Sequence, residues 1–304
     1  MKIRPQALLV LCAWTLSAGI VDDVRVAIAN NDLAGAGRLA QVFQQMNGST
    51  PELAAAVSYL ARGSLASKNL DGADRYATQA REMALKNLRG RKLDQVAFLP
   101  IALGASIEVH AQVLHARAQT SEAVAFLRGE LKTYGNTSLV ERIQKNINLI
   151  SMEGKPAPPL ESAVWFGPKP PTLASLRGKV VLLFFWAHWC PDCKEEVAIL
   201  ANLLKKYGPQ GLVVIGPTRY YGYVSNGDDA KPAVEKPYIE QIRIRYYSPL
   251  SQMPVPLSNA NFATYGASST PTLALIDRQG IVRYYHPGAA SEAELSSKIQ
   301  ALLK

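Results

Sequence analysis

Two cysteines three positions apart, between an apolar run and a helical segment, constrain this chain more than any other feature. In the stretch "FFWAHWCPDCKEE", residues 184–196, Cys190 and Cys193 follow the apolar run and precede a segment with helical periodicity. The run itself, "KVVLLFFW", is short and continuously apolar, which is typical of a strand buried on both faces. We therefore expect the pair to lie where a strand ends and a helix begins.

A cysteine pair of this spacing has several chemical uses, and the sequence argues against three of them. Structural zinc needs four ligands, but beyond the pair and Cys12 the chain has only scattered histidines, without finger-like spacing. A c-type haem needs His directly after the second cysteine, where Lys194 stands. A structural staple across so small a loop removes little entropy from the unfolded chain. We expect no metal.

Redox exchange fits the placement best. A cysteine at the start of a helix has unpaired backbone N–H groups and the positive end of the helix dipole beside it, and both stabilise a thiolate. We expect Cys190 to attack a disulfide and Cys193, one turn later, to resolve the mixed disulfide. No cofactor beyond this redox-active disulfide is expected.

The first residues, 1–19, are typical of a secretory signal peptide. Lys2 and Arg4 form a positive region, "ALLVLCAWTL" supplies an apolar core, and the small residues "SAG" follow. A membrane span needs roughly 20 apolar residues, and Asp22 ends this run too early. We expect cleavage near position 18 or 19, with an uncleaved N-terminal anchor as the alternative.

Export is consistent with the remaining cysteines and charges. Cys12 lies within the signal, so the exported protein keeps only the Cys190–Cys193 pair, and an oxidising compartment allows disulfide chemistry. Loss of the two basic signal residues lowers the formal net charge from +9 to +7, and no basic run stands out. A nucleic-acid partner would require clustered Lys and Arg. We expect a periplasmic or cell-envelope protein that binds no nucleic acid.

The two halves of the chain differ in pattern. Residues 22–151 are rich in Ala, Leu, Arg and Gln with helical periodicity, and short breaks carry turn or N-cap residues. This predicts an all-α domain of helical hairpins. One hairpin partly resembles a tetratricopeptide repeat through the spacing of Leu60, Ala73, Ala77 and Ala80. A groove for a partner peptide and a plain helical appendage remain equal alternatives.

The linker "EGKPAPPLE" separates this half from residues 154–304, where strand and helix patterns alternate. "GLVVIGP" predicts a second buried strand, and "TLALID" and "IVRYYHPG" predict a hairpin around "RQG". "SEAELSSKIQALLK" begins with a Ser-x-x-Glu capping box and predicts a C-terminal helix. The order predicts an α/β sheet with helices on both faces.

Residues from about Gly154 to Lys304 resemble a thioredoxin-fold domain of the TlpA/ResA type, the exported thiol-disulfide oxidoreductases. The matching features are "GKPAPPL", "LRGKVVLLFFWAHWC", Glu196 in the helix, and "GASSTPTLALIDRQGIV". The resemblance implies a thioredoxin fold in which a cis-proline, Pro271, faces the cysteine pair. The backbone of Thr270 would then lie near the sulfurs and pair with an extended substrate strand.

The residues around the cysteine pair are assigned roles by their position. Trp189 is expected in the apolar rim that binds substrate, with Trp186 packed beneath it. Phe184 stands six positions before Cys190, where thioredoxins often have a buried polar or acidic group. Glu196 or water is therefore the expected proton acceptor.

The segment 219–258, rich in Tyr and Pro, is longer than a minimal fold needs and includes a helix expected around 234–247. We interpret it as an insertion on the outer edge, with a loop that shapes the substrate site as the alternative. His188 is expected to be an exposed turn residue, with a titrating neighbour of the cysteines as the alternative.

These features predict an exported thiol-disulfide oxidoreductase that leans towards reduction. Its partners would be other exported proteins, as disulfide or dithiol substrates, and a periplasmic or membrane thiol reductant. One alternative is a peroxiredoxin-like peroxidase, but Leu183 and Ala187 occupy the Pro and Thr places of its Pro-x-x-x-Thr-x-x-Cys arrangement. Another is a binding scaffold in which the helical half recruits a partner and the redox half is secondary.

The dipeptide between the cysteines, Pro191-Asp192, is expected to tune the redox couple. The Asp192 carboxylate opposes the helix dipole and makes a nearby thiolate less stable, which disfavours the dithiol and makes the couple more reducing. The substitution Asp192→His is therefore predicted to raise the reduction potential, measured by equilibration with glutathione buffers. An unchanged or lower potential would show that this electrostatic argument is wrong.

Overall fold

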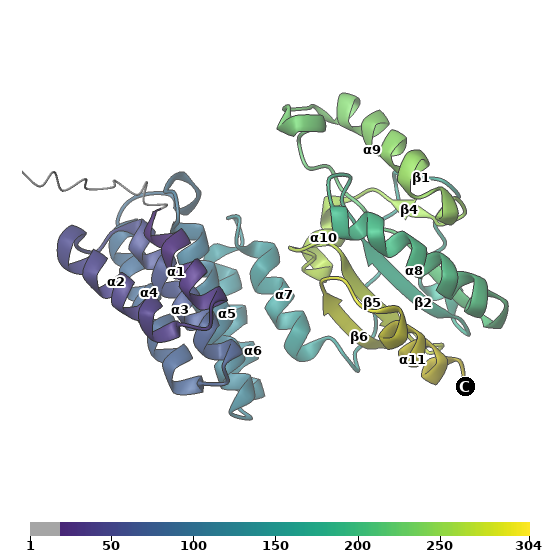
Figure 1. Cartoon of the computed structure of the whole chain (residues 1–304). Helices are drawn as coiled ribbons and strands as arrows, with labels where there is room; N and C mark the ends of the chain where they lie inside the picture. Colours follow the sequence, from purple (N-terminus) through teal and green to yellow (C-terminus); the bar gives the residue numbers. More distant parts are fainter. Residues whose placement is uncertain (1–18) are drawn as a thin grey trace, which may run out of the picture. The chain divides into compact units, whose positions relative to one another are not determined.

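The computed structural model describes residues 19–304 (Figure 1). The predicted signal peptide, residues 1–19, lies outside the described residues except for Gly19. No helix in the described part of the chain is long and apolar enough to cross a membrane.

The chain divides into two compact units. The first ends at Ser106 and the second comprises Ile107–Lys304, so the division falls within α5 (Leu99–Ala116). The sequence pattern changes further along, and the domain limits 22–151 and 154–304 stay a prediction.

The helix α7 (Val140–Ser151), which the sequence pattern assigns to the helical domain, packs within the second unit. It lies against α10 (Asn259–Tyr265), and Asn148 Nδ2 donates to the Thr264 carbonyl at 3.3 Å. Gly266 follows α10 with φ of 58°, and a Cβ there would lie 2.3 Å from the Lys145 backbone nitrogen. Only glycine allows this close approach of the two segments.

In the first unit, helices follow one another with short breaks. The breaks carry N-cap residues, because Asp32, Thr50 and Asn69 each accept a hydrogen bond from the backbone N–H three residues later. The helices are α1 (Ile20–Ala29), α2 (Leu33–Asn47), α3 (Pro51–Ala66), α4 (Leu70–Leu88) and the first part of α5.

The helices α3 and α4 pack against each other. Leu60 on α3 and Ala73, Ala77 and Ala80 on α4 are all buried. This confirms the predicted helical-hairpin architecture of the N-terminal half, whereas its likeness to a tetratricopeptide repeat stays a prediction.

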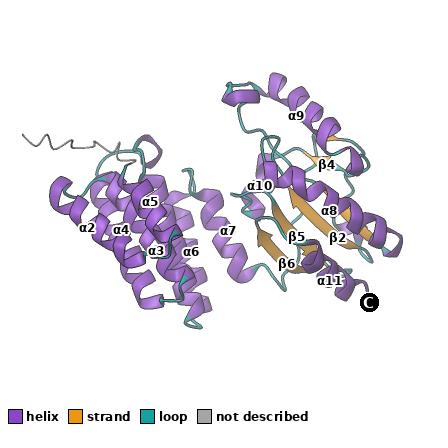
Figure 2. Ribbon diagram, in the orientation of Figure 1, coloured by secondary structure: helices purple, strands orange, loops and turns teal. Residues whose placement is uncertain are grey.

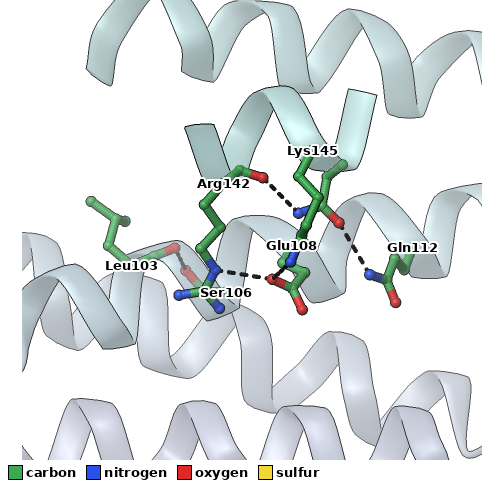
Figure 3. A network of polar contacts seen from close by, with 7 residues as sticks. Leu103, Ser106, Glu108, Gln112, Arg142 and Lys145 are labelled. Atoms are coloured by element: carbon green, nitrogen blue, oxygen red, sulfur yellow. Dashed lines mark hydrogen bonds and ion pairs between the residues drawn. The ribbon is translucent and has the colours of Figure 1, made fainter. Parts of the chain in front are cut away.

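A polar network joins the C-terminal part of α5 to α7 within the second unit (Figure 3). Glu108 accepts from Arg142 Nε at 2.9 Å and lies 3.5 Å from Lys145 Nζ. Gln112 Nε2 donates to Asn146 Oδ1 at 3.1 Å. In the sequence, α6 (Thr120–Tyr134) lies between α5 and α7, and it packs against α7.

A four-stranded sheet with the order β3-β2-β5-β6 is the centre of the second unit (Figure 2). β2 is parallel to β3 and antiparallel to β5, and β5 and β6 form the predicted hairpin. A separate antiparallel pair joins β1 and β4. The strands are β1 (Trp165–Phe166), β2 (Val180–Phe185), β3 (Leu212–Ile215), β4 (Val255–Pro256), β5 (Thr272–Ile276) and β6 (Val282–Pro287).

The strand β2 is buried along its whole length, as predicted, and its side chains alternate between two cores. Leu182 packs in the core that includes residues of α8 (Pro191–Tyr207) and α11 (Glu292–Leu303). Leu183 packs in the core that includes Phe262 of α10. The sheet therefore has helices on both faces.

The N-terminus of α11 differs in detail from the expectation. Ser291 Oγ accepts from the Glu294 N–H at 3.2 Å, but the Glu294 carboxylate accepts from the Tyr284 hydroxyl at 2.8 Å instead of completing a capping box. Helix α8 ends at Tyr207 with Gly208 as its C-cap, and the left-handed residue that follows is Gly211, with φ of 108°.

The burial of Leu182 at the centre of the sheet generates a stability prediction. Leu182→Ala should lower the free energy of unfolding by about 2–5 kcal/mol, because a close-packed core does not refill the cavity. Urea denaturation followed by tryptophan fluorescence measures the change. Ile244→Ala on α9 (Pro232–Tyr246), where Ile244 is 61% exposed, is the control and should change it by no more than about 0.5 kcal/mol. Equal losses in both variants would contradict this assignment of the core.

Candidate active site

The cysteine pair lies where the sequence predicts, between β2 and α8. Cys190 is the N-cap residue of α8, and Pro191 occupies the first turn. The Cys193 N–H donates to Cys190 Sγ at 3.1 Å, in the way that an N-cap Ser or Asp oxygen accepts a backbone N–H. The two sulfurs form a disulfide, with 5.3 Å between the Cα atoms.

The environment of Cys190 favours a reactive sulfur. After reduction, the N-terminal N–H groups of α8 and the helix dipole stabilise negative charge on Cys190. Cys193 is fully buried and Cys190 is 2% exposed, so the pair is accessible only to a substrate that docks closely. The arrangement supports reversible formation and cleavage of the disulfide.

The start of β5 lies beside the sulfurs. The Thr270 carbonyl oxygen is 3.4 Å from Cys190 Sγ, and the Thr270–Pro271 peptide bond is cis. A thiol at Cys190 would donate to this carbonyl. The structure thus places the backbone of Thr270 next to the cysteine pair, as the resemblance implies.

The two tryptophans of the turn lie in different surroundings. Trp189 is 45% exposed, which makes it available to a substrate at the rim. Trp186 is fully buried, and its Nε1 donates to the Gly216 carbonyl at 2.9 Å. The expected division between a rim residue and a packed residue matches these positions.

Glu196 lies one helical turn after Cys193, and only 2% of it is exposed. Its Oε1 accepts from the Ala290 N–H at 3.2 Å, and no residue among 19–304 gives Oε2 a hydrogen bond. Burial, together with the charge of Asp192, raises the pKa of Glu196 to about 7. A carboxyl with this pKa is able to take up or release a proton near neutral pH.

His188 is the main correction to the expectations for the site. The sequence predicts an exposed turn residue, but His188 is only 2% exposed. It lies edge-on to the rings of Tyr221, Tyr223 and Tyr238 at centroid distances of 5.3–5.5 Å. Its Nε2 lies 3.4 Å from Glu235 Oε1. Burial lowers the pKa of His188, partly offset by the Glu235 charge.

The segment 219–258 follows the edge strand β3 and contacts the turn before Cys190 through Tyr221 and Glu235, and its interpretation as an insertion on the outer edge stays a prediction. Sequence analysis missed Glu235 and Tyr221. The aromatic run "RYYGY" was a usable signal, since it supplies the Tyr221 and Tyr223 rings that lie against His188. Glu235 had no such signal, as one of 24 acidic residues.

In the part of the chain that the structure describes, no three His, Cys, Asp or Glu residues are grouped so that they could hold a metal ion.

Comparisons with known proteins concern the C-terminal half. Residues 152–303 match the family described as Redoxin. The thiol:disulfide interchange protein DsbE of Pseudomonas fluorescens is 31% identical over 156 residues, which are 50% of this chain and 78% of the relative. The thiol-disulfide oxidoreductase ResA of Bacillus thuringiensis is 28% identical over 132 residues, 43% of this chain and 67% of the relative.

A solved structure, a thiol:disulfide interchange protein of the thioredoxin family from Chlorobium tepidum, is 25% identical with a TM-score of 0.37. The match covers 49% of this chain and 97% of that chain. Together with the family match, the relatives confirm the thioredoxin fold of the C-terminal half and its resemblance to thiol-disulfide oxidoreductases.

The raised pKa of Glu196 generates a pH-dependent prediction. The pKa of Glu196 is about 7 in the folded protein and about 4.5 in the unfolded chain. The contribution of Glu196 to the free energy of unfolding is therefore fully present below pH 4.5 and is lost as the pH rises through 7. Relative to Glu196→Gln, the oxidised wild-type protein should therefore lose roughly 3 kcal/mol of unfolding free energy across this range.

Urea denaturation of both proteins at several pH values between 4 and 8 measures this difference. A matched control is Glu195→Gln, because Glu195 is exposed on the same helix. A wild-type minus Glu196→Gln difference that stays constant with pH would refute the assignment of this titration to Glu196.

Proposed function

We propose that this chain, which belongs to the redoxin family and carries its disulfide oxidoreductase domain in residues 152–303, reduces disulfides in other exported proteins. Disulfide oxidoreductase activity follows from the family and from relatives named for disulfide interchange. The observation that carries the proposal for this chain is the disulfide between Cys190, at the N-terminus of α8, and Cys193.

The reaction proceeds in two exchanges. The Cys190 thiolate attacks one sulfur of the substrate disulfide, which forms a mixed disulfide and releases the first substrate thiolate. The Cys193 thiolate then attacks the Cys190 sulfur, forms the intramolecular disulfide and releases the second. The substrate gains two electrons and the protein loses them, so an external thiol reductant must regenerate the dithiol.

Glu196 is the proposed proton acceptor for Cys193. Both side chains are buried and lie one helical turn apart on α8. The second exchange needs a Cys193 thiolate, and bulk water has no easy access to this sulfur. Because burial raises the pKa of Glu196 to about 7, a fraction of this carboxyl is ionised at neutral pH and is able to accept the thiol proton.

The substrate is proposed to lie along the Thr270 backbone, with Trp189 as its apolar contact. The Thr270 carbonyl is 3.4 Å from Cys190 Sγ, and Trp189 is 45% exposed. An extended peptide paired with this backbone would present its disulfide to Cys190. The direction of electron flow, towards substrate, rests on the charge of Asp192 beside the thiolate.

Export to the periplasm or cell envelope is the proposed location, with a periplasmic or membrane thiol protein as the reductant. The supports are the signal-like pattern of residues 1–19 and the use of cysteine only as a pair after it. The helical half is proposed to bind a partner peptide.

A trapping experiment tests the function. Cys193→Ser removes the resolving sulfur, so Cys190 should remain joined to its substrates as mixed disulfides that non-reducing gels separate and mass spectrometry identifies. The double variant Cys190→Ser/Cys193→Ser is the control and should trap none. Absence of dithiothreitol-sensitive adducts from Cys193→Ser, expressed with its own N-terminus, would contradict the proposed reaction.

A further inference from the structure

The buried pair His188 and Glu235 has no role in the exchange reaction. His188 lies two positions before Cys190, and Glu235 lies on α9. The Glu235 side chain is fully buried and the His188 side chain is 1% exposed. Burial of ionisable groups is costly unless they are paired, so the pair needs a compensating structural reason.

The contacts of Glu235 join three segments. Its Oε1 accepts from the Tyr221 N–H at 2.6 Å, and its Oε2 accepts from the Gly222 N–H at 2.9 Å. Its Oε1 also lies 3.4 Å from His188 Nε2. One carboxylate on α9 thus holds the loop after β3 by two hydrogen bonds and lies against the turn that leads to the cysteines.

Tyr221, whose backbone N–H is bound by Glu235, also contacts both tryptophans of the turn. Its ring is edge-on to Trp189 at a centroid distance of 5.6 Å, and its hydroxyl donates to the Trp186 carbonyl at 3.3 Å. The Arg219 guanidinium lies over the Tyr221 ring, 5.0 Å from its centroid. Trp189 is half-exposed, and its contact with the Tyr221 ring limits the directions in which its side chain can point.

The same segment also contacts the residue after the second cysteine. Lys194 Nζ lies 4.6 Å from the ring centroid of Tyr246, at the end of α9. In Figure 1, α9 lies on the side of the second unit away from β6. The segment therefore contacts residues on both sides of the Cys190–Cys193 pair in the sequence.

We propose that Glu235 and His188 are positioning residues that hold Trp189, through Tyr221, in the orientation that receives a protein substrate beside Cys190. The inference rests on the proposed function, because it assigns Trp189 to substrate binding. The sulfur itself is held independently, since Cys190 is fixed by the start of α8. Loss of the pair should weaken the binding of a protein substrate and leave the chemistry at the sulfur nearly unchanged.

Steady-state reduction of insulin, with dithiothreitol as electron donor, separates these two effects. Glu235→Gln keeps the size of the side chain but places an amide N–H₂ against a backbone N–H. It should raise the KM for insulin roughly tenfold and change kcat by no more than about twofold. The rate constant of the reduced protein with 5,5′-dithiobis(2-nitrobenzoate), a small disulfide, should also stay within about twofold.

Two further variants make the test specific. Tyr221→Leu removes the ring that contacts Trp189 but leaves the backbone N–H groups that satisfy Glu235, so it should raise KM even if Glu235→Gln does not fold. Adding Glu235→Gln to Trp189→Ala should give no further rise, because both act on the same contact. Glu240→Gln, on the same helix, where the half-buried Glu240 pairs with Arg243 and does not contact Tyr221 or His188 in the contacts described, is the matched control and should leave KM unchanged.

The inference is overturned if Tyr221→Leu and Glu235→Gln leave the KM for insulin unchanged. It is also overturned if Glu235→Gln raises KM further in the Trp189→Ala background, or slows the small disulfide as much as insulin. A wild-type protein that reduces neither probe would instead overturn the proposed function, and this inference with it.

Discussion

The hydrogen bond from the Cys193 N–H to Cys190 Sγ is the contact on which the rest of the site depends. It exists because β2, buried on both faces, ends at Phe185 and the chain turns directly into α8. The sulfur then occupies the place of an N-cap oxygen, where backbone N–H groups and the helix dipole favour negative charge. The second sulfur follows one turn later, within bonding distance of the first.

Two buried carboxylates near this contact, Glu235 and Glu196, differ in their hydrogen-bond partners. Glu235 accepts two backbone N–H groups and faces His188, so its partners offset the cost of burial. Among residues 19–304, Glu196 accepts from the Ala290 N–H only, and burial raises its pKa to about 7. The first arrangement suits a fixed structural anchor. The second suits a group that changes its protonation during the reaction, because neither of its states is strongly preferred at neutral pH.

The sequence predicts those features that depend on local pattern. The apolar run of β2, the position of Cys190 before a helix and the hairpin of β5 and β6 are periodic or motif-based, and the structure has all three. The surroundings of His188 were not predictable in this way, because they come from the segment that includes Tyr221 and Glu235, about thirty or more positions away. Secondary-structure propensity depends on a residue's own segment of the sequence. The burial of a turn residue depends instead on which distant segment packs over it in the fold.

Differential alkylation of the fully reduced, folded protein tests the central claim most directly. Limiting iodoacetamide at neutral pH, followed by peptide mass spectrometry, gives the rate of modification of each cysteine. The account predicts that Cys190 is modified first, at least roughly tenfold faster than Cys193, because its thiolate is stabilised at the N-terminus of α8. Faster modification of Cys193, or equal rates at the two sulfurs, would contradict it.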